Sequence, residues 1–531
     1  MRNKKLHVWL PLILSVVMVS GMFFGFKLNQ QTGGTDGFFK RDKRTSLQEA
    51  LDLIKSRYVD SIGIDSLQDD AMHEMVSHLD PHSVYIPATD YTSANEDLVG
   101  NFEGIGVEFN IFSDTVHVLH VIPGGPSDKA GLQIGDKIIK VDDSSIVSKT
   151  LPSADIRKMI RGKGGSTVKL TVLRGETIQY FNVIRGTIPL PSLDASFMLD
   201  AKTGYIKLSK FSGTTYKEFM KAMEGLQQNG LKALVLDLRN NGGGLMDEAT
   251  KIADEFLDGD KLIVYTEGTN TPKREYRASK EGVFEKGALT ILVDELSASA
   301  SEVLAGALQD WDRATIIGRR TFGKGLVQEQ YQLSDGSALR LTVARYYTPL
   351  GRSIQRPYDQ GKKVYMEELY NRYENGEMLS ADSIHFNGQK SYKTKGGKTV
   401  YGGGGIMPDV FVPIDSSLFI QSVTRLYLDG RFNNFVYQYY TGHLPQWEQY
   451  KNPADFAARY NNLEEPWQQL VKFAAKDSIN LQKVPADDKK EIQDRIKAYL
   501  ARFRWRTHGY YQVLNTTDKM VQKAMEVIRK A

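Results

Sequence analysis

Two residues near the middle of the 531-residue chain could form a nucleophile and its base: Ser299 and Lys324, with Gln328 four residues after the lysine. A serine hydroxyl is a weak nucleophile and needs a base that removes its proton. No histidine occurs between His120 and His385, so the base is either a distant histidine or another residue type. A lysine can serve when burial lowers its pKa from about 10.4 towards roughly 7–8. In an extended segment the side chains of Lys324 and Gln328 lie on the same face.

The residues around Ser299 predict a strand, a tight loop and a helix. Residues 290–293 are a short apolar run suited to a buried strand, and the amphipathic run 302–311 predicts a helix. Ser299 then lies near the N-terminus of that helix, where free N–H groups favour developing negative charge. The alternative is a capping box formed by Ser299 and Glu302, since serines cap helices far more often than they catalyse reactions.

The segments SASASEVLAGALQD (297–310) and RRTFGKGLVQ (319–328) resemble the core signature of the C-terminal processing peptidases, also called tail-specific proteases. The resemblance extends over roughly residues 45–412. It implies that Ser299 is the nucleophile, that Lys324 is its base and that Gln328 orients the lysine. The Ser–Lys pair is a recognised variant of the serine protease triad.

The oxyanion of such a reaction needs backbone N–H donors, and a glycine-rich loop can supply them. Residues 231–238 form a near-continuous apolar run that predicts a buried strand, and RNNGGG (239–244) follows it. This loop resembles the family's DLRxNPGG element, with Gly242 in place of the proline. The resemblance implies as donors Gly243, with Gly244 as an alternative, and Ala300.

Residues 90–185 resemble a PDZ domain, which binds the end of a polypeptide chain as an added strand. The turn in FEGIGVEF (102–109) is the expected carboxylate-binding loop, since glycines let backbone N–H groups converge. Its residues are Gly104, Ile105, Gly106 and Val107. Arg161, at the end of the expected PDZ helix, could connect this domain to the protease core and signal occupancy of the groove; the alternative is a solvated surface charge.

The composition excludes several classes of partner and chemistry. The net charge is +4 without a long basic run, so nucleic acid is not an expected partner. The chain has no cysteine, which excludes disulfides, a cysteine nucleophile and thiolate metal ligands. No metal and no organic cofactor are implied.

The N-terminus predicts export. Residues 8–26 are 19 consecutive residues without a charge, and Arg2, Lys4 and Lys5 precede them. Such a run can span a bilayer, with its basic flank in the cytoplasm and the rest of the chain outside. We favour an uncleaved membrane anchor that faces the periplasm or extracytoplasmic space. A cleaved signal peptide, with secretion to the periplasm, is the alternative.

The predicted fold is therefore a multidomain α/β protein. Its predicted parts are an anchor or signal segment (1–30), a linker and helical region (31–89), the PDZ domain (90–185), an α/β protease core (186–412) and a helical C-terminal domain (413–531). The family resemblance implies a homo-oligomer formed through the N-terminal helices, and the C-terminal domain is the alternative interface.

The predicted function is that of an exported serine endopeptidase whose substrates are proteins or peptides with accessible, apolar C-terminal tails. Two alternatives stay open. One is a catalytically inactive PDZ adaptor that binds exported partners on a protease-like scaffold. The other is a peptidase whose base is an imported histidine, His78 or His82.

Overall fold

The computed structural model describes residues 4–31, 45–112, 114–147, 151–384, 390–414 and 420–530. The chain divides into two compact units, residues 1–74 and 75–531. Most of the linker predicted over residues 31–44 lies outside the described residues.

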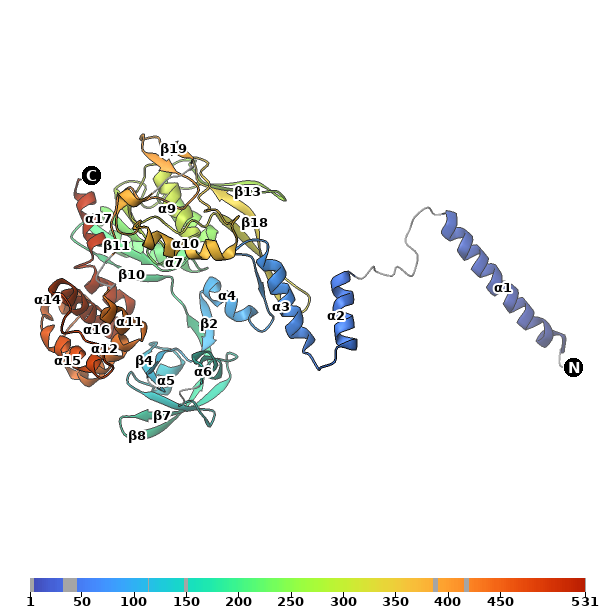
Figure 1. Ribbon diagram of the computed structural model, residues 1–531, viewed down its shortest axis with the longest axis horizontal. Helices are drawn as coiled ribbons and strands as arrows, with labels where there is room; N and C mark the ends of the chain where they lie inside the picture. The colour runs from blue at the N-terminus through green and yellow to red at the C-terminus, as the bar shows by residue number, and fades with distance from the viewer. Residues whose placement is uncertain are drawn as a thin grey trace. The chain divides into compact units, whose positions relative to one another are not determined.

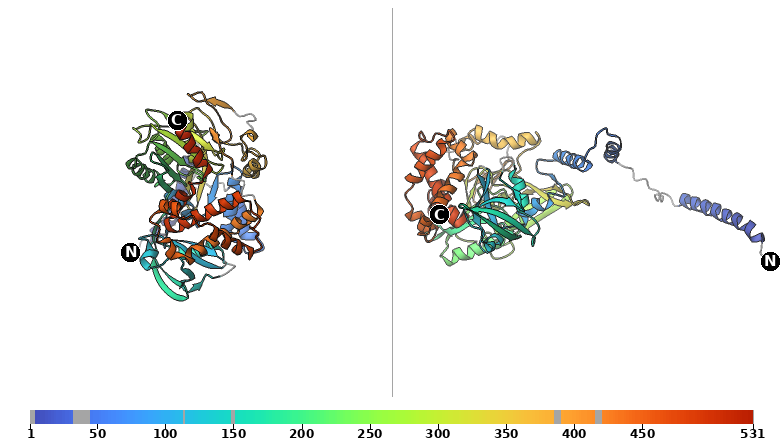
Figure 2. Two further views of the ribbon diagram at one scale, coloured as in Figure 1. Left: turned by 90° about the vertical axis from the view of Figure 1, so that its left-hand side faces the viewer. Right: turned by 90° about the horizontal axis from the view of Figure 1, so that it is seen from below.

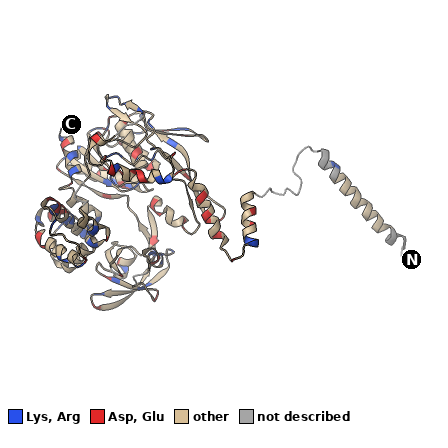
Figure 3. Ribbon diagram, in the orientation of Figure 1, with Lys and Arg blue, Asp and Glu red and all other residues tan. Residues whose placement is uncertain are grey.

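The first unit is helical. It contains α1 (Lys4–Gln31), α2 (Ser46–Arg57) and most of α3 (Ile64–Ser77). Helix α1 carries no charged residue between Lys5 and Lys27 (Figure 3). No helix in the described part of the chain combines the length and the apolar character needed to cross a membrane. Helix α2 begins after Thr45, whose hydroxyl accepts the Gln48 N–H while the Gln48 side chain accepts the Thr45 N–H, a capping box.

In the second unit, residues 91–189 fold around an antiparallel sheet with the strand order β3-β4-β5-β7-β8, in which β6 pairs with β5 (Figure 1). Period-2 burial explains its core: Val168, Leu170 and Val172 alternate on β7 and are fully buried. A hairpin turn at Gly175 and Glu176 connects β7 to β8. The elements are α4 (Tyr91–Val99), β2 (Asn101–Gly104), β3 (Val107–Phe112), β4 (Thr115–Val121), α5 (Pro126–Ala130), β5 (Lys137–Val141), β6 (Ser144–Ser145), α6 (Ser153–Ile160), β7 (Thr167–Arg174), β8 (Thr177–Ile184) and β9 (Gly186–Pro189).

The central sheet of the second unit has the strand order β10-β11-β12-β15-β16-β21, with parallel pairing from β11 onwards. The apolar run predicted as a buried strand forms β12, all of whose residues are buried. The crossover helices cover the face that includes Leu234 and Leu236. The elements are β10 (Leu193–Met198), β11 (Thr203–Leu208), α7 (Thr215–Gln228), β12 (Ala233–Asp237), α8 (Met246–Asp254), β15 (Ala288–Val293), α9 (Ala300–Asp310), β16 (Thr315–Gly318) and β21 (Val410–Phe411).

A second, antiparallel sheet carries the segment that follows Lys324. Strand β17 pairs with β18, which also pairs with β1 and β13. The elements of this region are β1 (Val84–Ile86), β13 (Leu262–Gly268), β14 (Thr271–Arg277), β17 (Leu326–Gln332), β18 (Ala338–Tyr347), α10 (Lys362–Glu374), a 3₁₀ turn (Ala381–Ser383), β19 (Ser391–Lys393) and β20 (Thr399–Tyr401).

The remaining helices pack around an aromatic core, and the views in Figures 1 and 2 agree that they form one group. The last helix, however, leaves that group: Met520, Val521 and Ala524 pack on the face of the central sheet opposite the crossover helices, against Val235 and Leu292. The elements are α11 (Gln421–Leu428), α12 (Arg431–Gly442), α13 (Leu444–Trp447), α14 (Pro453–Arg459), α15 (Glu464–Ala475), α16 (Ala486–Leu514) and α17 (Lys519–Lys530).

Candidate active site

Ser299 is the residue immediately before α9 and has an uncommon backbone conformation, with φ 56° and ψ −116°. A positive φ is unfavourable for a residue with a side chain, and such strain is concentrated at functional sites. The structure confirms the predicted order of strand, loop and helix: β15 ends at Val293, a loop follows, and Ser299 lies at the N-terminus of α9.

The neighbouring serines differ from Ser299 in exposure and hydrogen bonding. Ser297 and Ser301 are fully buried, and their hydroxyls donate to the backbone carbonyls of Leu238 at 2.8 Å and Asn241 at 2.9 Å. Ser299 is only partly buried. Of the three serines in the run, Ser299 alone combines the helix N-terminus with access to solvent.

Lys324 lies in a short segment just before β17. Its Nζ donates to Gln328 Oε1 at 2.8 Å, and Gln328 Nε2 donates to the carbonyl oxygen of His82 at 2.5 Å. Burial lowers the pKa of the Lys324 amine, and the positive charge of Arg340 lowers it further, while Asp80 acts in the opposite direction. Within the described residues Lys324 forms no ion pair that would offset burial, so the net shift of its pKa is downward.

A buried carboxylate joins the segments that carry Ser299 and Lys324. Glu302 Oε2 accepts the backbone N–H groups of Ser299 at 2.8 Å and Lys324 at 2.9 Å. Its Oε1 accepts the Gly323 N–H at 2.7 Å and the Thr321 hydroxyl at 2.5 Å. Burial raises the pKa of Glu302 to about 7, although its four hydrogen-bond donors act in the opposite direction.

A tyrosine hydroxyl makes the second connection between the two segments. The hydroxyl of Tyr346, on β18, lies 2.7 Å from the carbonyl oxygen of Lys324 and 3.2 Å from that of Ser299. The structure thus brings the backbones of the predicted nucleophile and base around two shared groups. The sequence did not indicate either function: it suggested Glu302 only as a capping residue and gave no chemical function to Tyr346.

The predicted oxyanion donors lie beside Ser299. An atom at the Cβ position of Gly243 would lie 2.7 Å from Ser299 Cβ and 3.0 Å from the Ala300 nitrogen, so only glycine fits there. Among the described residues the N–H groups of Ala300 and Gly244 have no acceptor, but the Gly243 N–H donates to Asn241 Oδ1 at 2.9 Å. Ala300 and Gly244 are therefore the N–H groups that are free to receive an oxyanion in this conformation.

The two histidines proposed as alternative bases have other surroundings. His82 Nε2 lies 2.7 Å from the hydroxyl of Tyr365, and burial together with the charge of Lys324 lowers the pKa of His82 to about 4. Its carbonyl oxygen holds Gln328, and its own N–H donates to Asp80 at 2.8 Å. His78 is exposed. His82 therefore acts on the site through its backbone, which the sequence did not indicate.

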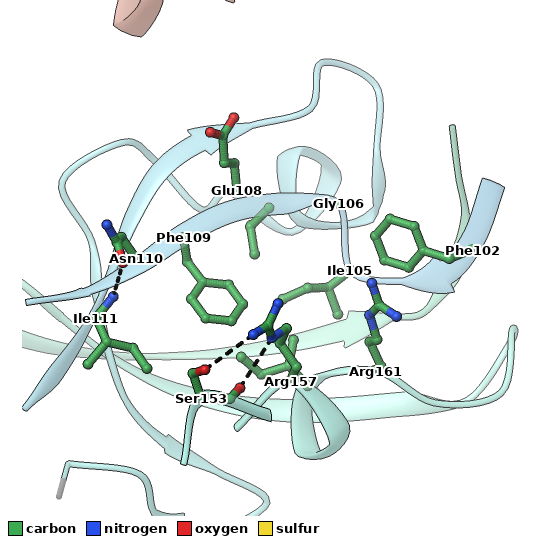
Figure 4. A pocket seen from close by; sticks show the side chains of 12 residues that line it. Phe102, Ile105, Gly106, Glu108, Phe109, Asn110, Ile111, Ser153, Arg157 and Arg161 are labelled. Carbon is green, nitrogen blue, oxygen red and sulfur yellow. Dashed lines mark hydrogen bonds between the residues drawn. The ribbon is translucent and has the colours of Figure 1, made fainter. Parts of the chain in front are cut away.

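The predicted PDZ loop borders a groove of about 550 Å³ between β3 and α6 (Figure 4). Gly104 ends β2 and Val107 begins β3, so the loop proper consists of Ile105 and Gly106. The N–H groups of Ile105 and Gly106 have no acceptor among the residues that the structure describes. Strand β3 is an edge strand of its sheet, as strand addition requires.

Arg161 follows α6 directly. Its Nη1 lies 2.6 Å from a carboxylate oxygen of Glu96 on α4, and its guanidinium stacks 4.2 Å from the centre of the Phe102 ring. Arg161 thus connects the groove to the helix that precedes the PDZ strands. No group of three or more His, Asp or Glu residues suited to a metal ion occurs in the described part of the chain.

Comparisons with known proteins match these parts of the chain. Residues 202–360 match the model of peptidase family S41, residues 104–184 match a PDZ domain, and residues 422–506 match a family of unknown function (DUF8443). The fold also resembles the photosystem II D1 C-terminal processing protease, with a TM-score of 0.36 and 27% identity over 69% of this chain and 86% of that one.

Curated relatives are similar over much of the chain. The probable CtpA-like serine protease of Staphylococcus haemolyticus (strain JCSC1435) is 36% identical over 59% of this chain; the match spans 63% of that protein, less than two thirds of its length. The corresponding protein of Staphylococcus aureus (strain N315) is 36% identical over 65% of this chain and 68% of its own length.

The carboxy-terminal processing protease CtpA of Bacillus subtilis (strain 168) is 33% identical over 399 residues, which are 74% of this chain and 84% of that protein. This similarity confirms the resemblance seen in the sequence. The chain therefore belongs to peptidase family S41, among the carboxy-terminal processing proteases.

Proposed function

We propose that the protein is a serine endopeptidase in which Ser299 is the nucleophile and Lys324 the base. The observation that carries this proposal is the double connection of the two segments through the Glu302 carboxylate and the Tyr346 hydroxyl. A fixed geometry between nucleophile and base reduces the entropic cost of reaching the transition state.

In the proposed mechanism the neutral amine of Lys324 takes the proton of the Ser299 hydroxyl as its oxygen attacks the scissile carbonyl. The tetrahedral oxyanion accepts hydrogen bonds from the N–H groups of Ala300 and of the glycine loop. Each such donor stabilises the transition state by about 2.7–4 kcal/mol. The Lys324 ammonium then protonates the leaving amine. In deacylation Lys324 takes a proton from the water molecule that attacks the ester, and it then returns this proton to the departing Ser299 oxygen, so that the hydroxyl and the neutral amine are restored.

Gln328 has a positioning function in this scheme. Its amide oxygen accepts from the Lys324 amine, and its amide nitrogen is held by the His82 carbonyl. Since the carbonyl fixes which end of the amide faces the lysine, the amine keeps its lone pair available for the serine proton. The buried Lys324 surroundings support this function.

The PDZ groove would capture the free C-terminal tail of a protein substrate. The unused N–H groups of the Ile105–Gly106 turn suit a terminal carboxylate, and the edge strand β3 suits the preceding residues. Apolar groove residues such as Ile105 and Ile160 suit an apolar last residue. The Arg161–Glu96 ion pair is proposed to link groove occupancy to the rest of the unit.

The test compares wild type with Ser299→Ala on an unfolded protein with an apolar C-terminal tail, with mass spectrometry of the fragments. We expect fragments from wild type alone. A Glu329→Gln variant, on the exposed side of β17, is the matched control and should cleave normally. Equal fragments from wild type and Ser299→Ala would refute the mechanism, and binding without any cleavage would favour the inactive adaptor.

We also propose that residues 8–26 tether the protein to a membrane and that the remainder works outside the cytoplasm. The uncharged sequence and the exposed apolar side chains of α1, such as Trp9 and Phe24, support this. Cell fractionation with alkaline extraction tests it: the full chain should stay in the membrane fraction, and a chain lacking residues 1–30 should not. Release of the full chain would contradict the anchor.

A further inference from the structure

Of the charged side chains that line the PDZ groove, Glu108 and Arg161 form ion pairs within the described residues, whereas Arg157 forms none. The groove is lined at the carboxylate loop by apolar side chains, and farther along by Arg157 and Ser153 on α6 and by Glu108 on β3 (Figure 4). In Figure 4 Arg157 lies on the path that a bound tail would take between β3 and α6, whereas the Glu108 side chain points to the other side of β3. The partners of these charged side chains therefore decide which tails the groove favours.

The only acidic side chain that lines the groove, among the described residues, is already paired. Glu108 lies 2.6 Å from Arg502 and 3.8 Å from Arg506, both on α16 of the C-terminal helices. Arg161 at the other end is paired with Glu96 at 2.6 Å. The two arginines of the C-terminal helices thus compensate the one negative charge that lines the groove, which reduces its repulsion of an acidic tail.

Arg157 differs from these residues because the described part of the chain offers it no carboxylate. Its Nη2 donates to Ser153 Oγ at 3.2 Å and its Nε to the Ser153 carbonyl at 3.3 Å. These two bonds hold the guanidinium along α6, on the side that faces β3 in Figure 4. Arg157 is exposed, so its remaining donors can reach a bound peptide.

The spacing along the groove places Arg157 opposite one residue of the tail. Arg161 stacks on Phe102, just before the carboxylate loop, so the adjacent groove residue Ile160 lies at that end of the groove. Arg157 precedes Ile160 by three residues, roughly 4.5 Å along a helix. Two residues of a bound strand span about 6.8 Å, and side chains two apart point to the same side. If the last side chain faces Ile160, the side chain two positions earlier faces Arg157.

The geometry points to a substrate rule: the groove selects tails whose third-from-last residue is Asp or Glu and whose last residue is apolar. This rule rests on the proposed function of the groove and adds a charge requirement to it. An Arg guanidinium binds a carboxylate through charge-assisted, often bidentate hydrogen bonds. Arg157 is therefore a specificity-determining residue.

The test measures binding of fluorescent ten-residue peptides to the full chain carrying Ser299→Ala, so that no peptide is cut. Three peptides end in the same valine and differ only at the third-from-last residue, which is Glu, Gln or Lys. At low ionic strength we expect the Glu peptide to bind about fivefold more tightly than the Gln peptide, and the Lys peptide to bind most weakly. Added salt should reduce the difference.

Two variants and one further peptide make the result specific. Arg157→Gln should bind the Glu and Gln peptides equally, whereas Lys158→Gln, which removes a neighbouring exposed charge outside the groove, should keep the preference. A Glu peptide with an amidated C-terminus should bind poorly to every variant. Equal affinity for the Glu and Gln peptides in the parent protein would overturn the charge rule but leave tail capture intact. Equal affinity for the acid and amide forms would overturn tail capture itself, and with it the charge rule.

Discussion

The amine of Lys324 is the residue-scale feature with the sharpest chemical consequence. Burial comes first among the causes that lower its pKa, followed by the charge of Arg340. An amine is a base only when it is deprotonated, so a lower pKa increases its active fraction near neutral pH. A base with the pKa of His82, which is lowered to about 4, would already be neutral at pH 7, so activity that depended on it would change with pH only near 4.

We therefore predict that kcat/KM rises with pH and levels off above the pKa of Lys324, at a midpoint below the ordinary lysine value of 10.5. Activity falls as the pH drops through that midpoint, because the amine becomes protonated. Lys324→Arg keeps the charge but stays protonated, and we expect a loss of about 10²–10⁴-fold. Peptide hydrolysis over a pH series measures both. A flat profile, or an active arginine variant, would contradict the account.

The Glu302 carboxylate accepts four hydrogen bonds from the segments around Ser299 and Lys324. Its replacement by glutamine tests whether these bonds position the nucleophile and the base. An amide has only one acceptor oxygen, and its NH₂ group would face two other donors. We expect Glu302→Gln to lower kcat about 10²-fold, with little change in KM, and to lower stability by about 1–3 kcal/mol. Steady-state kinetics and urea unfolding measure these effects. A folded variant with normal kcat would show that the carboxylate does not position the pair.

Sequence reasoning proposed Ser299, Lys324 and Gln328 from their residue types and from the resemblance of their segments to a known family. It could not find the functions of Glu302 and Tyr346, since these depend on where strand β18 and the segment before β17 meet in three dimensions. The contact of Gln328 with the backbone carbonyl of His82 could not be predicted either, because every residue type has a backbone carbonyl.

At the scale of elements, α17 has a structural function that its sequence position did not suggest. Val235 on β12 and Leu292 on β15 alternate with residues that face the crossover helices, so their side of the sheet needs a cover. Helix α17 provides it. The ion pair of Asp518 with Arg239, at 2.8 Å, fixes the start of this helix beside the strand end that precedes the glycine loop.

We predict that Met520→Ala, which removes a side chain that is 5% exposed, lowers the free energy of unfolding by about 2–4 kcal/mol. The substitution removes contacts between α17 and the central sheet, so the midpoint of urea unfolding of the second unit should move to a lower urea concentration. Lys523→Ala on the exposed side of the same helix is the control, with a change within about 0.5 kcal/mol. Equal stability of wild type and Met520→Ala would mean that α17 does not support the sheet.

At the scale of the whole second unit, the C-terminal helices also pack against the PDZ sheet. Tyr437 on α12 packs between Phe112 and His117, with ring centres 5.3 Å and 5.5 Å away, and its hydroxyl lies 3.3 Å from the Val118 carbonyl. The aromatic residues in residues 413–531 were expected to form a core, and most do. The contact with the PDZ sheet could not be foreseen, since nothing local marks which aromatic ring faces another domain.

This contact predicts a pH effect. Burial and the charge of Lys137 lower the pKa of His117 to about 4, and burial with the charge of Arg506 does the same for His120. Both histidines are neutral when folded, whereas the unfolded chain binds protons from about pH 6.5 downwards. The free energy of unfolding should therefore fall as the pH drops from about 6.5 to 4. Urea unfolding across this range measures the slope. A double variant, His117→Phe with His120→Gln, should show a shallower slope; an unchanged slope would contradict the prediction.

The most direct measurement of the central claim is covalent labelling of the full chain with a fluorophosphonate, followed by mass mapping of the modified peptide. The account predicts one adduct on Ser299 and its strong reduction in Lys324→Ala, because the hydroxyl then lacks its base. Glu329→Gln, the control, should label like wild type. Labelling at a different serine, or undiminished labelling of Ser299 without Lys324, would contradict the proposed pair.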